Sequence, residues 1–194
     1  MAGPDNGIYN AFNKGINTAS GSFVGFLNSG DKLANIYILN KIMTKLDNIK
    51  FIDAIYGDVC INDLKGTVRR RIVPGSFKYW KIYLGWMPPH PMLCIRREIF
   101  SKLDGFDENL KIAADYDLLL RYLLFNKVSI CYLPYLFVIM EPATTSGGSL
   151  FNILYANWEV LKSWKKYTYI IPFWVILLKP LQKIAQLRIK FWKI

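Results

Sequence analysis

The sequence contains one histidine, His90, and only three cysteines, Cys60, Cys94 and Cys131. The cysteines are far apart and none belongs to a C-x-x-C pair, so the pattern argues against a zinc site or a disulfide framework. With a single histidine, no cluster of histidines can hold a metal, and a Ser-His-Asp triad would have to use His90. The cysteine usage fits a reducing compartment.

Long apolar runs are also missing. The apolar run that opens the C-terminal segment, Tyr169–Leu178, has ten residues. As a helix it would span about 15 Å, roughly half of the hydrocarbon core of a bilayer. The N-terminus is polar and has no h-region, so we expect no signal peptide.

Acidic residues are absent after Glu159, whereas eight Lys or Arg follow it. These eight account for most of the net charge of +11 and leave +3 for the first 159 residues. We therefore expect no nucleic-acid partner, because the positive charge lies in the tail and not in the folded body.

The C-terminal tail predicts a membrane-surface helix. Lysines and one arginine alternate with apolar and aromatic residues over 179–194, which is typical of a helix lying on an anionic membrane surface. Packing on its own domain or on a partner chain is the alternative. We divide the chain into an α/β domain, residues 1–149, and a helical membrane-associating tail, residues 150–194.

The residues present near the N-terminus predict a helix, a strand and a polar loop. Ile8, Phe12 and Ile16 form an apolar stripe at helical spacing. Gly21 is expected to end that helix in a left-handed cap. Ser22–Leu27 is expected to be a central strand, and the loop 28–31 would follow its carboxyl end, where open α/β sheets bind ligands.

The remaining pattern alternates between helices and strands, which indicates an α/β fold. We expect helices at 33–46, 79–84, 97–103, 113–125 and 150–166. We expect strands at 51–61, 67–73, 92–95, 128–133 and 136–140, with a hairpin turn at 62–66. The loop 85–91 contains three prolines and should be stiff.

Two carboxylates are the candidates for chemistry. Asp31 follows the first strand and could bind a divalent cation, although an aspartate there is often only the N-cap of the next helix. Asp115 stands in the first turn of a helix and is a candidate general base, with a purely structural first-turn carboxylate as the alternative. His90 could contact an acceptor or be a rigid turn residue. Trp86 could stack on a sugar or belong to the core.

Several motifs together resemble one family. They are 6–16 (NGIYNAFNKGI), 19–21 (ASG), 26–31 (FLNSGD), 56–58 (YGD), 88–91 (PPHP) and 114–118 (ADYDL). In this order the chain is similar to family 2 glycosyltransferases of the GT-A fold, of the bacterial type that builds capsule, O-antigen or colanic-acid-like polysaccharides. The likeness covers roughly residues 4–140.

The resemblance implies a partial GT-A, Rossmann-like mixed sheet flanked by helices, with C-terminal amphipathic helices after it. It also implies transfer of a single sugar from a nucleotide-diphosphate sugar to an acceptor hydroxyl, with inversion of the anomeric centre as in most members of the family, and a Mg²⁺ or Mn²⁺ ion at the diphosphate. By position, Asp31 is the metal ligand and Asp115 the catalytic base. The donor-binding residues are Asn13, Lys14 and Asn28, and the acceptor-binding residues are Trp86 and His90.

The implied acceptor is a lipid-linked saccharide or an oligosaccharide, which agrees with a cytoplasmic protein held peripherally on the inner face of the membrane. Family members usually carry about 70 to 80 further residues before this point, which supply strands and base-binding aspartates. A truncated, non-catalytic remnant that acts as a membrane-surface binding module is therefore the alternative function.

Overall fold

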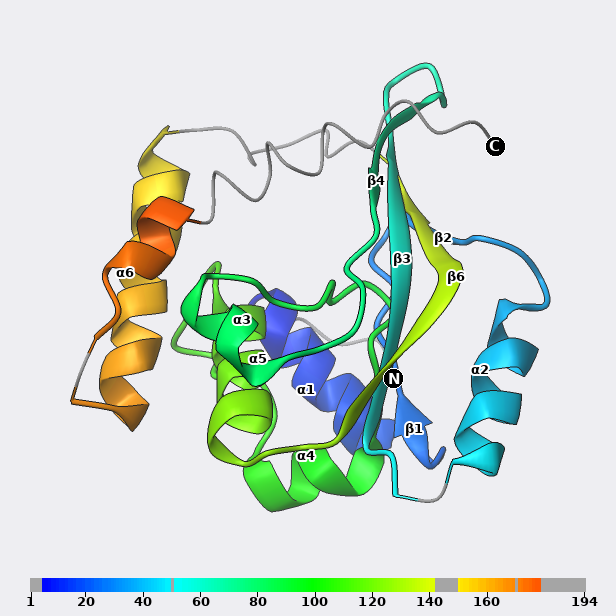
Figure 1. Cartoon of the computed structure of the whole chain (residues 1–194), viewed down its shortest axis with the longest axis horizontal. Coiled ribbons are helices and arrows are strands. Elements are labelled where there is room, and N and C mark those ends of the chain that lie inside the picture. Colours follow the sequence, from blue (N-terminus) through cyan, green and yellow to red (C-terminus); the bar gives the residue numbers. More distant parts are fainter. Residues whose placement is uncertain (1–4, 50, 142–149, 170, 179–194) are drawn as a thin grey trace.

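The computed structural model describes residues 5–49, 51–141, 150–169 and 171–178. Six strands form one mixed sheet in the order β1-β5-β3-β6-β2, and β4 also pairs with β3 (Figure 1). The strands are β1 (Phe23–Val24), β2 (Lys32–Leu33), β3 (Ala54–Asn62), β4 (Val68–Ile72), β5 (Cys94–Arg96) and β6 (Ile130–Met140). The helices are α1 (Ile8–Thr18), α2 (Ile38–Asn48), α3 (Tyr79–Tyr83), α4 (Arg97–Leu103), α5 (Ala114–Leu119), which continues as the π-helix η1 (Leu120–Phe125), and α6 (Leu150–Tyr167).

The centre of the sheet is β3, whose first seven residues are all buried. It pairs in parallel with β6 and antiparallel with β4 and β5. A Cβ atom on Gly57 would lie 2.2 Å from the ring of Phe137, so this position on β3 requires glycine. Strands that are buried on both faces are mainly apolar, and the buried exception in β3 is Asp58, whose carboxylate accepts hydrogen bonds from Arg71 and Tyr132.

Helices cover both faces of the sheet. One core cluster lies under α2 and includes Ile38, Ile42 and Phe137. The larger cluster joins α1, α4, α5, η1 and α6 on the opposite side of the sheet, as Figure 1 shows. The α/β class expected from the alternating pattern is confirmed.

Two predictions about the N-terminal segment are wrong. The strand expected at Ser22–Leu27 has only two residues in regular pairing, and β1 lies at an edge of the described sheet because it pairs only with β5. Gly21 is not a left-handed cap. The helix ends at Thr18, and Ala19 is extended while its amide still bonds to the Gly15 carbonyl, so no left-handed residue is needed.

Two further boundaries differ from the prediction. Leu33 does not begin the second helix, because it belongs to β2 and pairs with Val138 of β6, and α2 starts only at Ile38. The two strands expected at 128–133 and 136–140 are one strand, β6. Pro134 is tolerated inside it because the register with β3 shifts between Tyr132 and Leu136, where a ladder hydrogen bond is not required.

The other predicted elements are present within one to three residues: α1, the β3–β4 hairpin, α3, β5, α4 and the helical segment from Ala114 to Phe125. The predicted helix 150–166 is α6, which packs through Val160 and Trp164 into the main core. The domain boundary at 149/150 stays a prediction. No helix in the described ranges is long and apolar enough to cross a membrane, and the predicted amphipathic segment 179–194 lies outside them.

Candidate active site

Asp115 lies in the first turn of α5 and meets the only histidine of the chain. Its Oδ1 accepts a hydrogen bond from the backbone N–H of Tyr116 at 2.8 Å. Its Oδ2 lies 3.0 Å from Nδ1 of His90. The Asp115 side chain is 28% exposed, so this carboxylate is held in place and still reaches solvent. A carboxylate in this state is suited to accept a proton from a bound hydroxyl group.

His90 comes from the proline-rich loop between α3 and β5. Pro88 and Pro91 on either side of it are buried, and the His90 carbonyl accepts the N–H of Leu93 at 3.1 Å in a turn. The flanking prolines restrict the backbone of His90, so the position from which its half-exposed imidazole extends is fixed. From the sequence, His90 was expected to contact the acceptor and Asp115 to act as the base. The structure shows that the two side chains are in contact.

Asp31 ends a tight turn in which its own N–H bonds to the Asn28 carbonyl at 3.0 Å. Gly30 in this turn has φ +90°, a conformation that other residues rarely adopt. Burial raises the pKa of Asp31, while hydrogen bonds from the Glu141 backbone and the Asn28 side chain, and the charge of His90, oppose that effect. His90 therefore acts electrostatically on Asp31 and contacts Asp115 directly, so the structure gathers Asn28, Asp31, His90 and Asp115.

The surroundings of Asp31 are compatible with a role of its carboxylate as a ligand to a divalent cation. Its Oδ2 is buried and has no hydrogen-bond partner among the described residues, which leaves a carboxylate oxygen available. Within the described part of the chain there is no group of three or more His, Cys, Asp or Glu that could form a complete metal site. Magnesium is often bound by one or two carboxylates together with phosphate oxygens and water, and manganese accepts the same ligands. The residues present fit that arrangement, with Asp31 as the ligand from this chain.

Asn13 is engaged by the segment that follows α4. Its side-chain amide donates to the Phe106 carbonyl at 2.9 Å and to Oε1 of Glu108 at 2.8 Å, and its Oδ1 accepts the N–H of Phe106 at 2.9 Å. Lys14 forms an exposed ion pair with Asp5 at 2.9 Å. The donor-binding role expected for Asn13 and Lys14 stays a prediction.

Trp86 packs against the main core. Its ring lies edge-on to Tyr56, with ring centroids 6.3 Å apart, and the ammonium group of Lys81 lies 5.1 Å from its ring centroid. A partly buried ring in such contacts agrees with the core alternative, and contact with an acceptor sugar stays a prediction.

Two residues near Asp115 were not named from the sequence. The Tyr9 hydroxyl donates to the Ile112 carbonyl at 2.8 Å, and burial raises the pKa of Tyr9. Glu159 on α6 binds the backbone just before α5. The only available signal for Glu159 was that it is the one acidic residue between positions 142 and 194.

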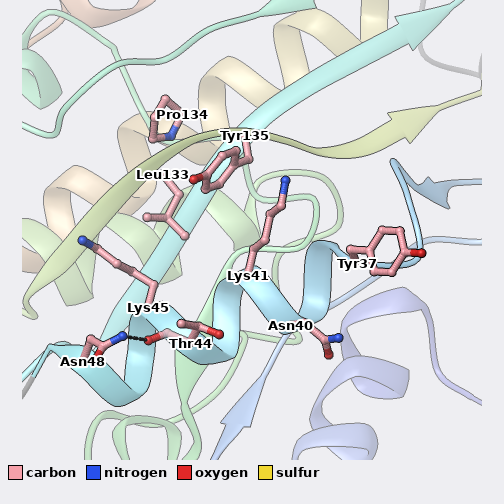
Figure 2. Close-up of a pocket in the computed structure, with 9 residues that line it drawn as sticks. All are labelled: Tyr37, Asn40, Lys41, Thr44, Lys45, Asn48, Leu133, Pro134 and Tyr135. Atoms are coloured by element: carbon pink, nitrogen blue, oxygen red, sulfur yellow. Dashed lines mark hydrogen bonds between the residues drawn. The ribbon is translucent and has the colours of Figure 1, made fainter.

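A separate groove of about 410 Å³ lies between α2 and residues 133–135 of β6. Figure 2 shows Lys41 rising from α2 toward Tyr135, while Lys45 and Asn48 lie further along the helix, where the Asn48 side chain donates to the Thr44 carbonyl. None of the candidate residues described above lines this groove. It is distinct from the Asp31–His90–Asp115 cluster.

Sequence comparison finds distant relatives that are glycosyltransferases, although no family model matches the chain. An uncharacterized glycosyltransferase of Mycobacterium tuberculosis is 29% identical over 126 residues, which cover 61% of this chain and 45% of that protein. A PGL/p-HBAD biosynthesis glycosyltransferase of Mycobacterium bovis is 26% identical and is covered to 44%. An uncharacterized glycosyltransferase of Methanocaldococcus jannaschii is 27% identical and is covered to 38%. The chain thus spans less than half the length of these relatives.

Solved structures confirm the fold. The crystal structure of S. aureus TarS 1–349 in complex with UDP-GlcNAc matches 86% of this chain and 47% of that chain, with a TM-score of 0.60 and 16% sequence identity. TarS 1–349 in another crystal structure matches 84% of this chain and 52% of that chain, with a TM-score of 0.53 and 18% identity. The mixed α/β sheet flanked by helices is therefore the GT-A fold of TarS.

Proposed function

We propose that this chain acts as a glycosyltransferase that moves one sugar from a nucleotide-diphosphate sugar to an acceptor hydroxyl in the synthesis of a surface polysaccharide. The observation that carries the proposal is the cluster of Asp115, His90 and Asp31, drawn from three separate loops and helix ends. Its distant relatives are glycosyltransferases, and TarS, whose fold it shares, has been crystallised with UDP-GlcNAc.

In the proposed reaction Asp115 takes the proton of the acceptor hydroxyl while the oxygen attacks the anomeric carbon. The bond from that carbon to the diphosphate oxygen breaks, and the diphosphate leaves with the electron pair. Direct displacement of this kind inverts the anomeric centre. His90 lies 3.0 Å from Asp115 and holds the carboxylate in a defined orientation.

Asp31 is proposed to hold a Mg²⁺ or Mn²⁺ ion, which when bound neutralises the charge that develops on the diphosphate. The oxygen available for the ion is the buried Oδ2 of Asp31, which has no hydrogen-bond partner in the part of the chain that the structure describes. Asn28, whose side chain bonds to Asp31, would then lie on the donor side, and Trp86 and His90 on the acceptor side.

The proposed acceptor is a lipid-linked or oligosaccharide acceptor at the cytoplasmic face of the membrane. Supporting this proposal, α6 exposes Phe151, Leu154 and Trp158, which are 71%, 60% and 54% exposed, and Lys162 lies over the ring of Trp158. Exposed aromatic residues combined with lysines favour an anionic lipid surface.

Calorimetric titration with UDP in the presence of Mn²⁺ tests the metal and donor part of the proposal. We expect Mn²⁺-dependent binding that Asp31→Asn weakens at least about tenfold, the loss of one strong charge-assisted contact. The control is Glu98→Gln, which changes an exposed carboxylate on α4 that pairs with Arg96 and Lys102. Equal UDP affinity in the wild type and Asp31→Asn would remove Asp31 from this role.

A further inference from the structure

Glu159 lies within α6 and is completely buried. Its Oε1 accepts the N–H of Lys111 at 2.7 Å, and its Oε2 accepts the N–H groups of Ile112 at 2.9 Å and Ala113 at 2.8 Å. A buried carboxylate is tolerated when its oxygens are satisfied, and three backbone donors do this here. One side chain of α6 thus fixes the conformation of residues 111–113.

These three amides come directly before α5, so Glu159 fixes the segment that leads into the helix and places a carboxylate near the helix N-terminus. The N-cap residue of α5 is Ala113, which has no side-chain acceptor of its own. The first N–H groups of a helix have no intrahelical partner, and negative charge near them is favourable. The start of α5 is therefore set by a residue 46 positions further along the chain.

Helix α6 holds α5 at a second place. Nε1 of Trp164 donates to the hydroxyl group of Tyr116 at 2.9 Å, and both residues are buried. The buried carboxylate of Asp117 accepts from Nζ of Lys166 at 3.1 Å and from the hydroxyl group of Tyr167 at 3.3 Å. Residues before and after position 115 are thus bound to α6, which lies on the same side of the sheet as α5 in Figure 1.

Asp115 lies between these two anchors, and its Oδ2 is directed to His90. We propose that Glu159 is a positioning residue for Asp115: by fixing residues 111–113 it sets the start of α5, so that the Asp115 carboxylate meets the imidazole of His90. The role of Asp115 as a base rests on the function proposed above, whereas the positioning is a property of the folded chain and can be tested without turnover.

The single histidine makes the test direct. In a protein labelled with ¹⁵N, the ring nitrogens of His90 give one set of signals that report the contact between Nδ1 and Asp115. Glu159→Gln keeps the size of the side chain but turns an NH₂ group toward backbone donors. We expect it to shift the amide signals of residues 111–113 and also the Nδ1 signal of His90, in the direction in which Asp115→Asn shifts it. Glu98→Gln is the matched control and should leave the Nδ1 signal unchanged.

A folded Glu159→Gln protein with wild-type His90 ring signals would overturn the proposal, provided that Asp115→Asn moves them. If Glu159→Gln does not fold, hydrogen exchange of the wild type decides: the amides of residues 111–113 should exchange as slowly as those of α5. Exchange at the rate of open loops would show that Glu159 does not hold them.

Kinetics separate this proposal from the proposed function. In a transfer assay Glu159→Gln should lower kcat about 10- to 100-fold with little change in the donor KM, because a base displaced by about 1 Å loses that much. An NMR shift of His90 in a protein without transferase activity would support the positioning and contradict the proposed function. In a folded variant, an unchanged kcat together with unchanged His90 signals would contradict the positioning, whereas an unchanged kcat with shifted His90 signals would contradict the role of Asp115 as the base.

Discussion

Asp115 and Asp31 lie near the same histidine but are supported in opposite ways. Asp115 follows a backbone segment fixed by the buried Glu159, and its two oxygens bond to Tyr116 and His90. Asp31 sits in a turn between two-residue strands, and its buried Oδ2 has no partner among the described residues. The difference indicates that the proposed base is preorganised by its contacts within the protein, whereas the proposed metal ligand keeps a carboxylate oxygen that no described residue engages.

The largest effect should come from the proposed base. Asp115→Asn keeps the shape of the side chain but cannot accept the proton, so kcat should fall about 10²- to 10⁴-fold. UDP affinity should stay unchanged, because Asp115 is not proposed to contact the donor. The measurement is release of the nucleoside diphosphate from the nucleotide-sugar donor in the presence of acceptor. Transfer within about twofold of the wild-type rate would make Asp115 a structural first-turn carboxylate.

The free energies of unfolding of two variants, Glu159→Gln and Asp31→Asn, test the contrast between Asp115 and Asp31. Glu159→Gln should lower the free energy of unfolding by about 3 kcal/mol, because buried backbone N–H groups lose an acceptor. Asp31→Asn should change it by less than about 1 kcal/mol, since the amide oxygen can keep the bonds from Asn28 and Glu141 while Oδ2 had no partner to lose. Urea unfolding of the two variants measures both values. Equal losses would remove the proposed difference.

A smaller effect concerns the ion pair between α6 and the loop before α5. Burial raises the pKa of Asp107, but hydrogen bonds from Lys166 and Asn109 have a larger, opposite effect. The pKa of Asp107 is therefore below its usual value. This contribution is therefore present above the unfolded pKa of about 4 and is lost as the pH falls through the lower folded value. Asp107→Asn, which leaves Lys166 paired with the buried Asp117, should cost about 1 kcal/mol or less at pH 7 and should flatten the acid limb of the stability curve. Parallel acid limbs would show that this pair does not contribute.

Much of the fold could be predicted because local patterns agree with the final packing. The apolar stripe at Ile8, Phe12 and Ile16 predicted α1, and the turn at 62–66 predicted the β3–β4 hairpin. The predicted element boundaries were wrong where strand pairing between residues far apart in the sequence decides the structure. Leu33 has the spacing of a helical residue but pairs with Val138, and Pro134 looks like a break but lies at a register shift.

The candidate site divides in the same way. Asp31 and Asp115 could be named because each follows a local signal, a strand followed by a polar turn and a helix start. Their joint approach to His90 depends on how loops distant in sequence meet. Glu159 is a more distant case, because its partners are backbone amides, which leave no mark in the sequence.

The most direct test of the central claim uses His90 as a probe for a paramagnetic ion. If Mn²⁺ and UDP bind together at Asp31, the ring signals of His90 should broaden, and signals of Tyr135 in the separate groove should broaden less. Asp31→Asn should abolish the broadening. UDP that binds with Mn²⁺ but leaves the His90 signals sharp would contradict the assignment of Asp31, His90 and Asp115 to one active site.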